Sequence, residues 1–303
     1  MKNQASVAAG GRVVNENAII KQISLVGIIG NVLLCAFKLY AGVAGKSGAM
    51  VSDAVHSLSD VFATFVAFLG VKLSKKSADQ AHPYGHERLE CIASLILGMI
   101  LLVTGIGIGK VGLTNIFAGN YDQLAVPGTI ALVAAVVSIV VKESMFWYTR
   151  HYAKVLNSAA FMADAWHHRS DAFSSIGSLI GLGGAILGFP VLDSIASVVI
   201  CLCILKVAYD ILVDAVKKML DSSCGEEFES NMEQFILQQK GVEAVDMLHT
   251  RMFGNKVYVD LEIEVQRDKP LWEAHEVAAQ VHDRVENKYD NVKHVMIHVN
   301  PTR

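Results

Sequence analysis

Residues 49–73 read AMVSDAVHSLSDVFATFVAFLGVKL, an apolar run that contains an aspartate, a histidine and a second aspartate. A membrane span needs roughly 20 predominantly apolar residues, so this stretch is long enough to cross a bilayer. Each ionisable side chain at the centre of a membrane costs roughly 2.5–3.5 kcal/mol, even on lenient scales. The run therefore predicts a span that carries a buried polar function rather than a simple anchor.

The pattern D-A-x-H-x-x-S-D occurs twice, at Asp53–Asp60 and at Asp164–Asp171 in a second apolar run. Residues at i, i+3 and i+7 share one face of a helix, so each helix turns an Asp, a His and an Asp to one side. Two imidazoles and two carboxylates form a tetrahedral set that suits zinc. The predicted transport ligands are His56, Asp60, His167 and Asp171. The alternative is a polar network without metal, and the repetition favours the metal; Asp53 and Asp164 are candidates for a supporting role.

Composition extends this membrane interpretation to most of the chain. The 303 residues are 52% hydrophobic and 18% charged, whereas soluble domains carry about 25% charged residues. Six apolar runs of spanning length are present, at 19–43, 49–73, 89–117, 124–147, 159–187 and 191–213. Lysine and arginine concentrate in alternate connections, which predicts that both termini are cytoplasmic. The formal net charge of -3 argues against nucleic acid as a partner.

The tail, residues 221–303, has the pattern of a water-soluble α+β domain. Helical spacing of apolar residues occurs at 226–239 and 271–285, and strand patterns occur at 242–252, 257–265 and 292–299. Gly254-Asn255 predicts a hairpin turn between the first two strands. We expect a small open sheet with both helices on one face.

Six spans, two H-x-x-x-D half-sites and a compact tail resemble the cation diffusion facilitator family over nearly the whole chain. The resemblance implies a polytopic α-helical membrane domain over 1–220 and a cytoplasmic ferredoxin-like, metallochaperone-like αββαβ domain over 221–303. It also implies that the four intramembrane residues form the transport site and that the tail dimerises and binds regulatory metal. Family members with His at the first ligand position tend to prefer zinc.

The resemblance implies further site residues. Asp79, His82 and His86 match a D-x-x-H-x-Y-G-H segment that holds a second metal in some members; otherwise they form a solvated loop. Arg88 matches a basic residue that pairs with an acid after the sixth span, here Asp221. In the tail, the matching ligand positions are Asp246, Glu262, His275 and His298. This sequence departs from the fullest pattern, because some members have His at the first two tail positions and Asp where Asn300 stands. His282 and His294 are expected on solvated faces.

These features predict a homodimeric zinc/proton antiporter that exports Zn²⁺ from the cytoplasm across the plasma (inner) membrane by alternating access. Metal ligands must lose protons to bind metal, so release on one side can accompany proton uptake. Iron(II) or manganese(II) efflux by the same mechanism is the alternative, although two His ligands weigh against manganese. A non-transporting membrane metal sensor or scaffold is the alternative class. No H-E-x-x-H is present to favour a metalloenzyme. Zinc is expected as substrate and candidate regulatory ligand, with no obligatory cofactor.

Overall fold

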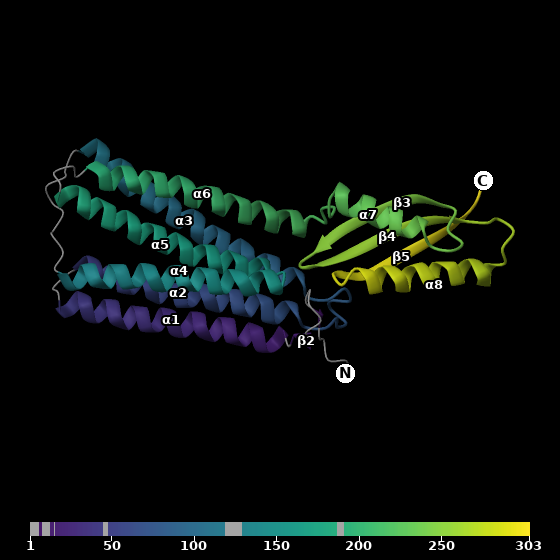
Figure 1. Ribbon diagram of the computed structural model, residues 1–303, viewed down its shortest axis with the longest axis horizontal. Helices are drawn as coiled ribbons and strands as arrows, with labels where there is room; N and C mark the ends of the chain where they lie inside the picture. The colour runs from purple at the N-terminus through teal and green to yellow at the C-terminus, as the bar shows by residue number, and fades with distance from the viewer. Residues whose placement is uncertain (1–5, 8–12, 15, 45–47, 119–128, 187–190) are drawn as a thin grey trace. The chain divides into compact units, whose positions relative to one another are not determined.

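The computed structural model describes residues 6–7, 13–14, 16–44, 48–118, 129–186 and 191–303. Within these ranges, the side chains of some helical residues, Asp53 and His56 among them, lie outside the description. The chain forms two compact units. The first is Met1–Lys76 with Leu89–Ala215, and the second is Ser77–Arg88 with Val216–Arg303. The first is helical and the second is mixed α and β (Figure 1).

Six long helices make up the first unit, after a short antiparallel pair of strands, β1 (Ser6–Val7) and β2 (Val13–Val14). The helices are α1 (Glu16–Ala44), α2 (Gly48–Ser74), α3 (Arg88–Ala118), α4 (Thr129–Val155), α5 (Ala159–Ile186) and α6 (Val191–Met219). The shortest has 27 residues and is about 40 Å long, enough for a hydrocarbon core of about 30 Å. Among the described residues, the stretches Glu16–Ala41 and Arg88–Phe117 are long and apolar enough to span a membrane by length and composition alone.

Alanines bring the helices of this unit close together. α1 packs on α2, α4 packs on α5, and α2 and α5 contact each other. Fully buried Ala63 and Ala67 of α2 share a core with Ala160 and Ala163 of α5. Small side chains let helix backbones approach closely in a membrane. This packing places the polar faces of α2 and α5 inside the bundle.

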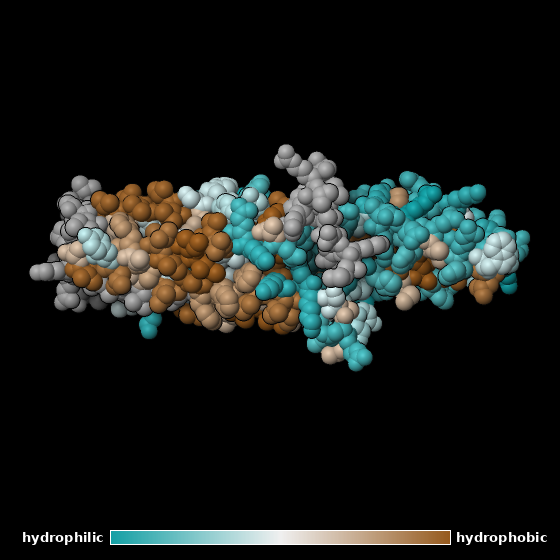
Figure 2. All heavy atoms as spheres, turned by 90° about the horizontal axis from the view of Figure 1, so that it is seen from below, coloured by the Kyte–Doolittle hydropathy of each residue, from teal (hydrophilic) through white to brown (hydrophobic). Residues whose placement is uncertain are grey.

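The outer surface of the first unit is apolar. Large hydrophobic side chains point outward along the helices, including Leu33, Phe62 and Val103, which are each about two-thirds exposed at 64%, 65% and 65%. Figure 2 shows hydrophobic residues across this unit and hydrophilic residues across the second. Soluble monomers rarely expose continuous apolar surface on this scale. The surface is therefore suited to contact lipid.

The tail is a three-stranded sheet covered by two helices on one face (Figure 1). Its elements are α7 (Glu226–Leu237), β3 (Ala244–Phe253), β4 (Lys256–Val265), α8 (Leu271–Lys288) and β5 (Val292–Pro301). β4 lies in the middle, antiparallel to β3 and parallel to β5. Alternate β4 residues, Val259, Leu261 and Ile263 among them, pack against both helices. The αββαβ order predicted from sequence is confirmed.

A loop from between the second and third spans packs with the tail. Arg88 forms an ion pair with Asp221, as the resemblance implied, and both residues belong to the second unit. The Tyr258 hydroxyl donates to the Tyr84 carbonyl oxygen at 3.0 Å. Gly254 has a φ of +66° in the hairpin turn, and an added Cβ would lie 2.5 Å from a backbone oxygen of the loop. Residues 77–88 thus extend the predicted tail, which began at residue 221.

We expect Ile263→Ala to destabilise the tail by about 2–4 kcal/mol, because the fully buried side chain leaves a cavity between β4 and the helices. Native-state hydrogen exchange of the β4 amides in the full chain measures this loss as a smaller opening free energy. Ile263→Val, which removes a single methyl group, is the matched control and should cost about 0.5–1.5 kcal/mol. Equal protection in all three proteins would show that this strand is not the stable core.

Candidate metal transport site

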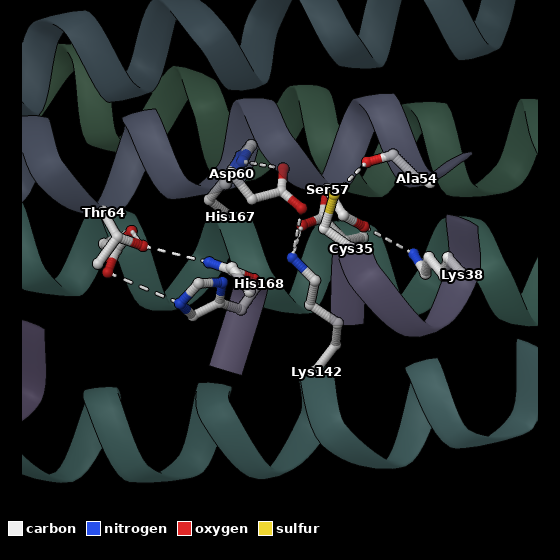
Figure 3. A network of polar contacts seen from close by, with 12 residues as sticks. Cys35, Lys38, Ala54, Ser57, Asp60, Thr64, Lys142, His167 and His168 are labelled. Atoms are coloured by element: carbon white, nitrogen blue, oxygen red, sulfur yellow. Dashed lines mark hydrogen bonds and ion pairs between the residues drawn. The ribbon is translucent and has the colours of Figure 1, made fainter. Parts of the chain in front are cut away.

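Three of the predicted transport ligands meet between α2 and α5. Asp60, His167 and Asp171 are 1%, 2% and 7% exposed, and each offers a ligand atom within 4.8 Å of the others. Nε2 of His167 lies 3.2 Å from Oδ1 of Asp60. Asp171 follows His167 by one helical turn, so both side chains turn to the same face of α5. The structure thus assembles carboxylate, imidazole and carboxylate from two helices. Figure 3 shows Asp60 and His167 of this set.

The spacing of these atoms fits a small transition-metal ion. Zinc binds imidazole nitrogen and carboxylate oxygen at about 2.0–2.2 Å, which places tetrahedral ligands about 3.4 Å from one another. The imidazole–carboxylate separation of 3.2 Å is already close to that value. Nδ1 of His167 is buried with no hydrogen-bond partner among the described residues. The site can therefore take up a metal with little change in the distance between these two ligands.

A lysine that the sequence analysis did not single out lies between the two carboxylates. Nζ of Lys142, on α4, donates to Oδ2 of Asp60 at 2.5 Å (Figure 3) and to Oδ2 of Asp171 at 2.8 Å. Lys142 is 1% exposed. A buried charge is tolerated when it is paired, so the ammonium neutralises part of the negative charge of the ligand set. A lysine inside a predicted span was the available signal.

Further polar contacts flank the ligand set on two sides. On one side, Asp164 accepts a hydrogen bond from the Thr64 hydroxyl at 3.1 Å and lies 3.7 Å from Nε2 of His168. On the other side, Nζ of Lys38 donates to the Ser57 hydroxyl at 2.9 Å. All of these side chains are buried. The four helices α1, α2, α4 and α5 therefore all contribute buried polar side chains to the interior of the bundle.

Three residues of the repeated D-A-x-H-x-x-S-D pattern, Asp53, His56 and Asp164, are not among the three converging ligands that the structure describes. The backbone of α2 passes through Asp53 and His56, but their side chains fall outside the described part of the structure. His56 precedes Asp60 by one turn, so its Cα lies on the same face of α2 as that of the carboxylate ligand. Asp164 lies beside the three converging ligands rather than among them, in contact with Thr64.

The loop of the second unit brings Asp79, His82 and His86 together, with ligand atoms within 4.8 Å of one another. Oδ1 of Asp79 lies 3.2 Å from Nδ1 of His82, and Oδ2 lies 3.5 Å from Nε2 of His86. The Asp79 carboxylate also accepts the backbone N–H groups of Ala81 and His82, at 3.1 and 2.8 Å. These bonds fix its orientation toward the two imidazoles.

The four predicted tail residues are arranged differently. The Asn300 amide donates to Oδ2 of Asp246 at 2.8 Å and to Oε2 of Glu262 at 3.1 Å. His298 stands opposite Glu262 in the β4–β5 register, and His275 is exposed on α8. Within the described residues, none of the four belongs to a group of three converging ligands. The asparagine amide occupies the place between the carboxylates where a cation was predicted.

Comparison with known proteins agrees with both units. Residues 24–220 match the model of the cation efflux transmembrane domain, and residues 224–302 match that of the cation efflux protein cytoplasmic domain. The chain is a member of the cation diffusion facilitator family. The predicted fold class, a polytopic helical membrane domain with a cytoplasmic α+β domain, is confirmed. This family member is an integral membrane transporter for divalent metal cations, not an enzyme.

Three relatives of this cation diffusion facilitator are similar over most of its length. The uncharacterized transporter MJ0449 of Methanocaldococcus jannaschii is 35% identical, covering 91% of this chain and 96% of the relative. Magnetosome protein MamB of a Magnetospira species is 33% identical, covering 90% and 92%. Manganese efflux system protein MneP of Bacillus subtilis is 29% identical, covering 93% and 96%.

Proposed function

We propose that this transporter exports zinc from the cytoplasm across the plasma (inner) membrane in exchange for protons. One observation carries the proposal: two carboxylates and an imidazole from α2 and α5 converge inside the bundle around a buried ammonium. With His56, the ligand set has two imidazoles and two carboxylates, which suits zinc. Homodimerisation through the cytoplasmic domain and cytoplasmic termini belong to the same proposal.

Manganese and iron are the competing substrates. A relative is named as a manganese efflux system protein, and another is a magnetosome protein. Manganese favours carboxylate, carbonyl and water oxygens, whereas imidazole suits zinc and iron. His167 is a ligand whose nitrogen is already positioned beside a carboxylate. The imidazole content of the site therefore favours zinc over manganese and leaves iron as the nearer competitor.

The ammonium of Lys142 neutralises part of the charge of Asp60 and Asp171 when no metal is bound. A divalent ion about 4 Å from an ammonium is repelled by roughly 8 kcal/mol at an effective dielectric of about 20. Metal and lysine therefore do not share the two carboxylates; the side chain withdraws when metal binds and returns when metal leaves. The site then exchanges one cation for another instead of leaving two carboxylates uncompensated in the membrane.

Proton coupling follows from the same ligands. Imidazole and carboxylate must be deprotonated to bind metal, so metal release on the outer side is coupled to proton uptake there. Histidine changes its charge near physiological pH and is the suitable proton carrier. Ligands contributed by two helices also couple metal binding to helix movement, which alternating access requires. The loop ligands Asp79, His82 and His86 are proposed as a second zinc site in the same transporter.

The purified protein in vesicles tests the proposal, with metal entry followed by an internal indicator dye. Zinc movement is expected to exceed iron and manganese movement and to rise several-fold when a proton gradient opposes it. Dissipating the gradient with a proton carrier should abolish that increase. Faster manganese or iron movement would overturn the choice of substrate, and insensitivity to the gradient would overturn antiport. Protein that binds metal but moves none would favour a membrane sensor.

A further inference from the structure

A third group of histidine and carboxylate side chains meets at the edge of the tail. His282 and Glu286 lie one turn apart on α8, and His294 lies on β5, an edge strand of the sheet. Nε2 of His282 is 3.1 Å from Oε1 of Glu286, and Nδ1 of His294 is 3.9 Å from the same oxygen. The two imidazole rings are 5.7 Å apart between centroids. The three ligand atoms all lie within 4.8 Å of one another.

A backbone hydrogen bond orients the first of these imidazoles. Nδ1 of His282 lies 2.9 Å from the carbonyl oxygen of Val295. A carbonyl oxygen only accepts hydrogen bonds, so Nδ1 must carry the proton. In a neutral imidazole this leaves the lone pair on Nε2, the atom that faces Glu286. Metal-binding histidines commonly have this arrangement, in which the second nitrogen donates to a carbonyl and fixes the ring.

The contact between His282 and Glu286 needs a positive charge. With Nδ1 protonated, the Nε2 lone pair and a carboxylate lone pair face each other at 3.1 Å, which is repulsive unless a proton or a metal ion lies between them. Nδ1 of His294 lies 3.9 Å from the same carboxylate oxygen and is available as a third ligand atom. The three side chains are between one-third and one-half exposed, so an ion from solution can reach them.

We propose that His282, Glu286 and His294 bind a divalent transition-metal ion at the α8–β5 edge of the tail. Two imidazoles and one carboxylate match the three protein ligands of open zinc sites, in which water takes the fourth position. Magnesium and calcium prefer all-oxygen sites and are excluded by the two nitrogens. This site is separate from the loop ligands that include Asp79 and from the predicted tail ligands that include Asp246. Since β5 and α8 enclose part of the tail core, a bound ion ties two core elements together.

Equilibrium dialysis of the full-length protein against zinc, with metal content measured per chain, tests this site independently of transport. Glu286→Gln and His294→Ala should each bind one zinc ion fewer than the unsubstituted protein. Glu276→Gln, an exposed acid on the same helix, is the matched control and should keep the full number. With cobalt(II), the visible absorption of this site should be lost in His294→Ala and kept in the control.

The number of zinc ions bound per chain supports or overturns the proposal, provided that the variants are folded. Glu286→Gln keeps the size of the side chain, so circular dichroism and elution volume should match those of the unsubstituted protein. A loss of one ion in both variants, with the fold intact, supports the site. An unchanged zinc count in both folded variants would overturn it and would show that a proton alone bridges His282 and Glu286.

Discussion

Asp171→Asn is expected to lower zinc transport by more than about 100-fold while the protein stays folded. The substitution removes one anion from the proposed ligand set and one of the two carboxylates that hold the Lys142 ammonium. Replacing residues that merely support a metal ligand typically costs 10–100-fold, so loss of a ligand should reach or exceed the upper value. Initial rates of zinc entry into vesicles measure the effect directly. Zinc binding at the proposed loop site, Asp79, His82 and His86, and at the proposed tail site should remain.

The matched control is Asp210→Asn, the same change at an aspartate of α6 whose side chain is 57% exposed and pairs with Lys206. An exposed pair of this kind contributes little, so transport should stay within about twofold of the unsubstituted rate. Elution volume and thermal unfolding in detergent establish that both variants are folded. Normal transport by folded Asp171→Asn would remove this residue from the transport site.

Lys142→Met is expected to have two opposite effects on the protein. Without the ammonium, Asp60 and Asp171 face each other without a counter-charge, and breaking a buried pair in this way costs about 3–5 kcal/mol. The metal-free protein should therefore unfold at a lower temperature. Zinc no longer has to displace a competing cation, so its apparent affinity should rise by at least about tenfold, or 1.4 kcal/mol. Turnover should fall, because the metal leaves more slowly.

Thermal unfolding with and without zinc, combined with zinc titration, separates these effects. The upward shift of the unfolding temperature on zinc addition should be larger in Lys142→Met than in the unsubstituted protein. Lys142→Arg retains the charge and should keep zinc affinity close to normal. Lys206→Met, at a lysine that is 70% exposed on α6, controls for loss of a helical lysine. Unchanged stability and zinc affinity in Lys142→Met would show that the ammonium does not compete with metal.

Much of the membrane unit could be predicted because apolar runs and membrane helices have the same physical cause. Four of the six helices begin and end within about three residues of the predicted bounds. The exceptions are α4, which was predicted to end at 147 and continues to Val155, and α6, which was predicted to end at 213 and continues to Met219. Arg150 and Lys154 end the apolar run but not the helix, because hydropathy reports the membrane boundary and charged residues form helices readily. A hydropathy pattern therefore locates a span more reliably than the helix that contains it.

Periodicity within one helix predicted which side chains share a face, and this was sufficient to bring Asp60, His167 and Asp171 together. It could not predict Lys142, because the contact depends on how α4 packs against α2 and α5. The tail shows the same limit. His282 and His294 lie on different elements and meet only through the docking of α8 on β5, so their local patterns indicated solvated faces.

The packing of residues 77–88 with the tail bears on truncation experiments. Deleting everything after Met219 would leave Arg88 without Asp221, Glu87 without Lys293, and the Tyr84 carbonyl without the Tyr258 hydroxyl. These contacts hold the loop that connects α2 to α3. The helix α2 carries Asp60, one of the predicted transport ligands. A tail-less transporter would therefore also lose the contacts that hold this loop near its junction with α3, and its activity would not report the contribution of the tail alone. Point substitutions at tail sites provide the cleaner comparison.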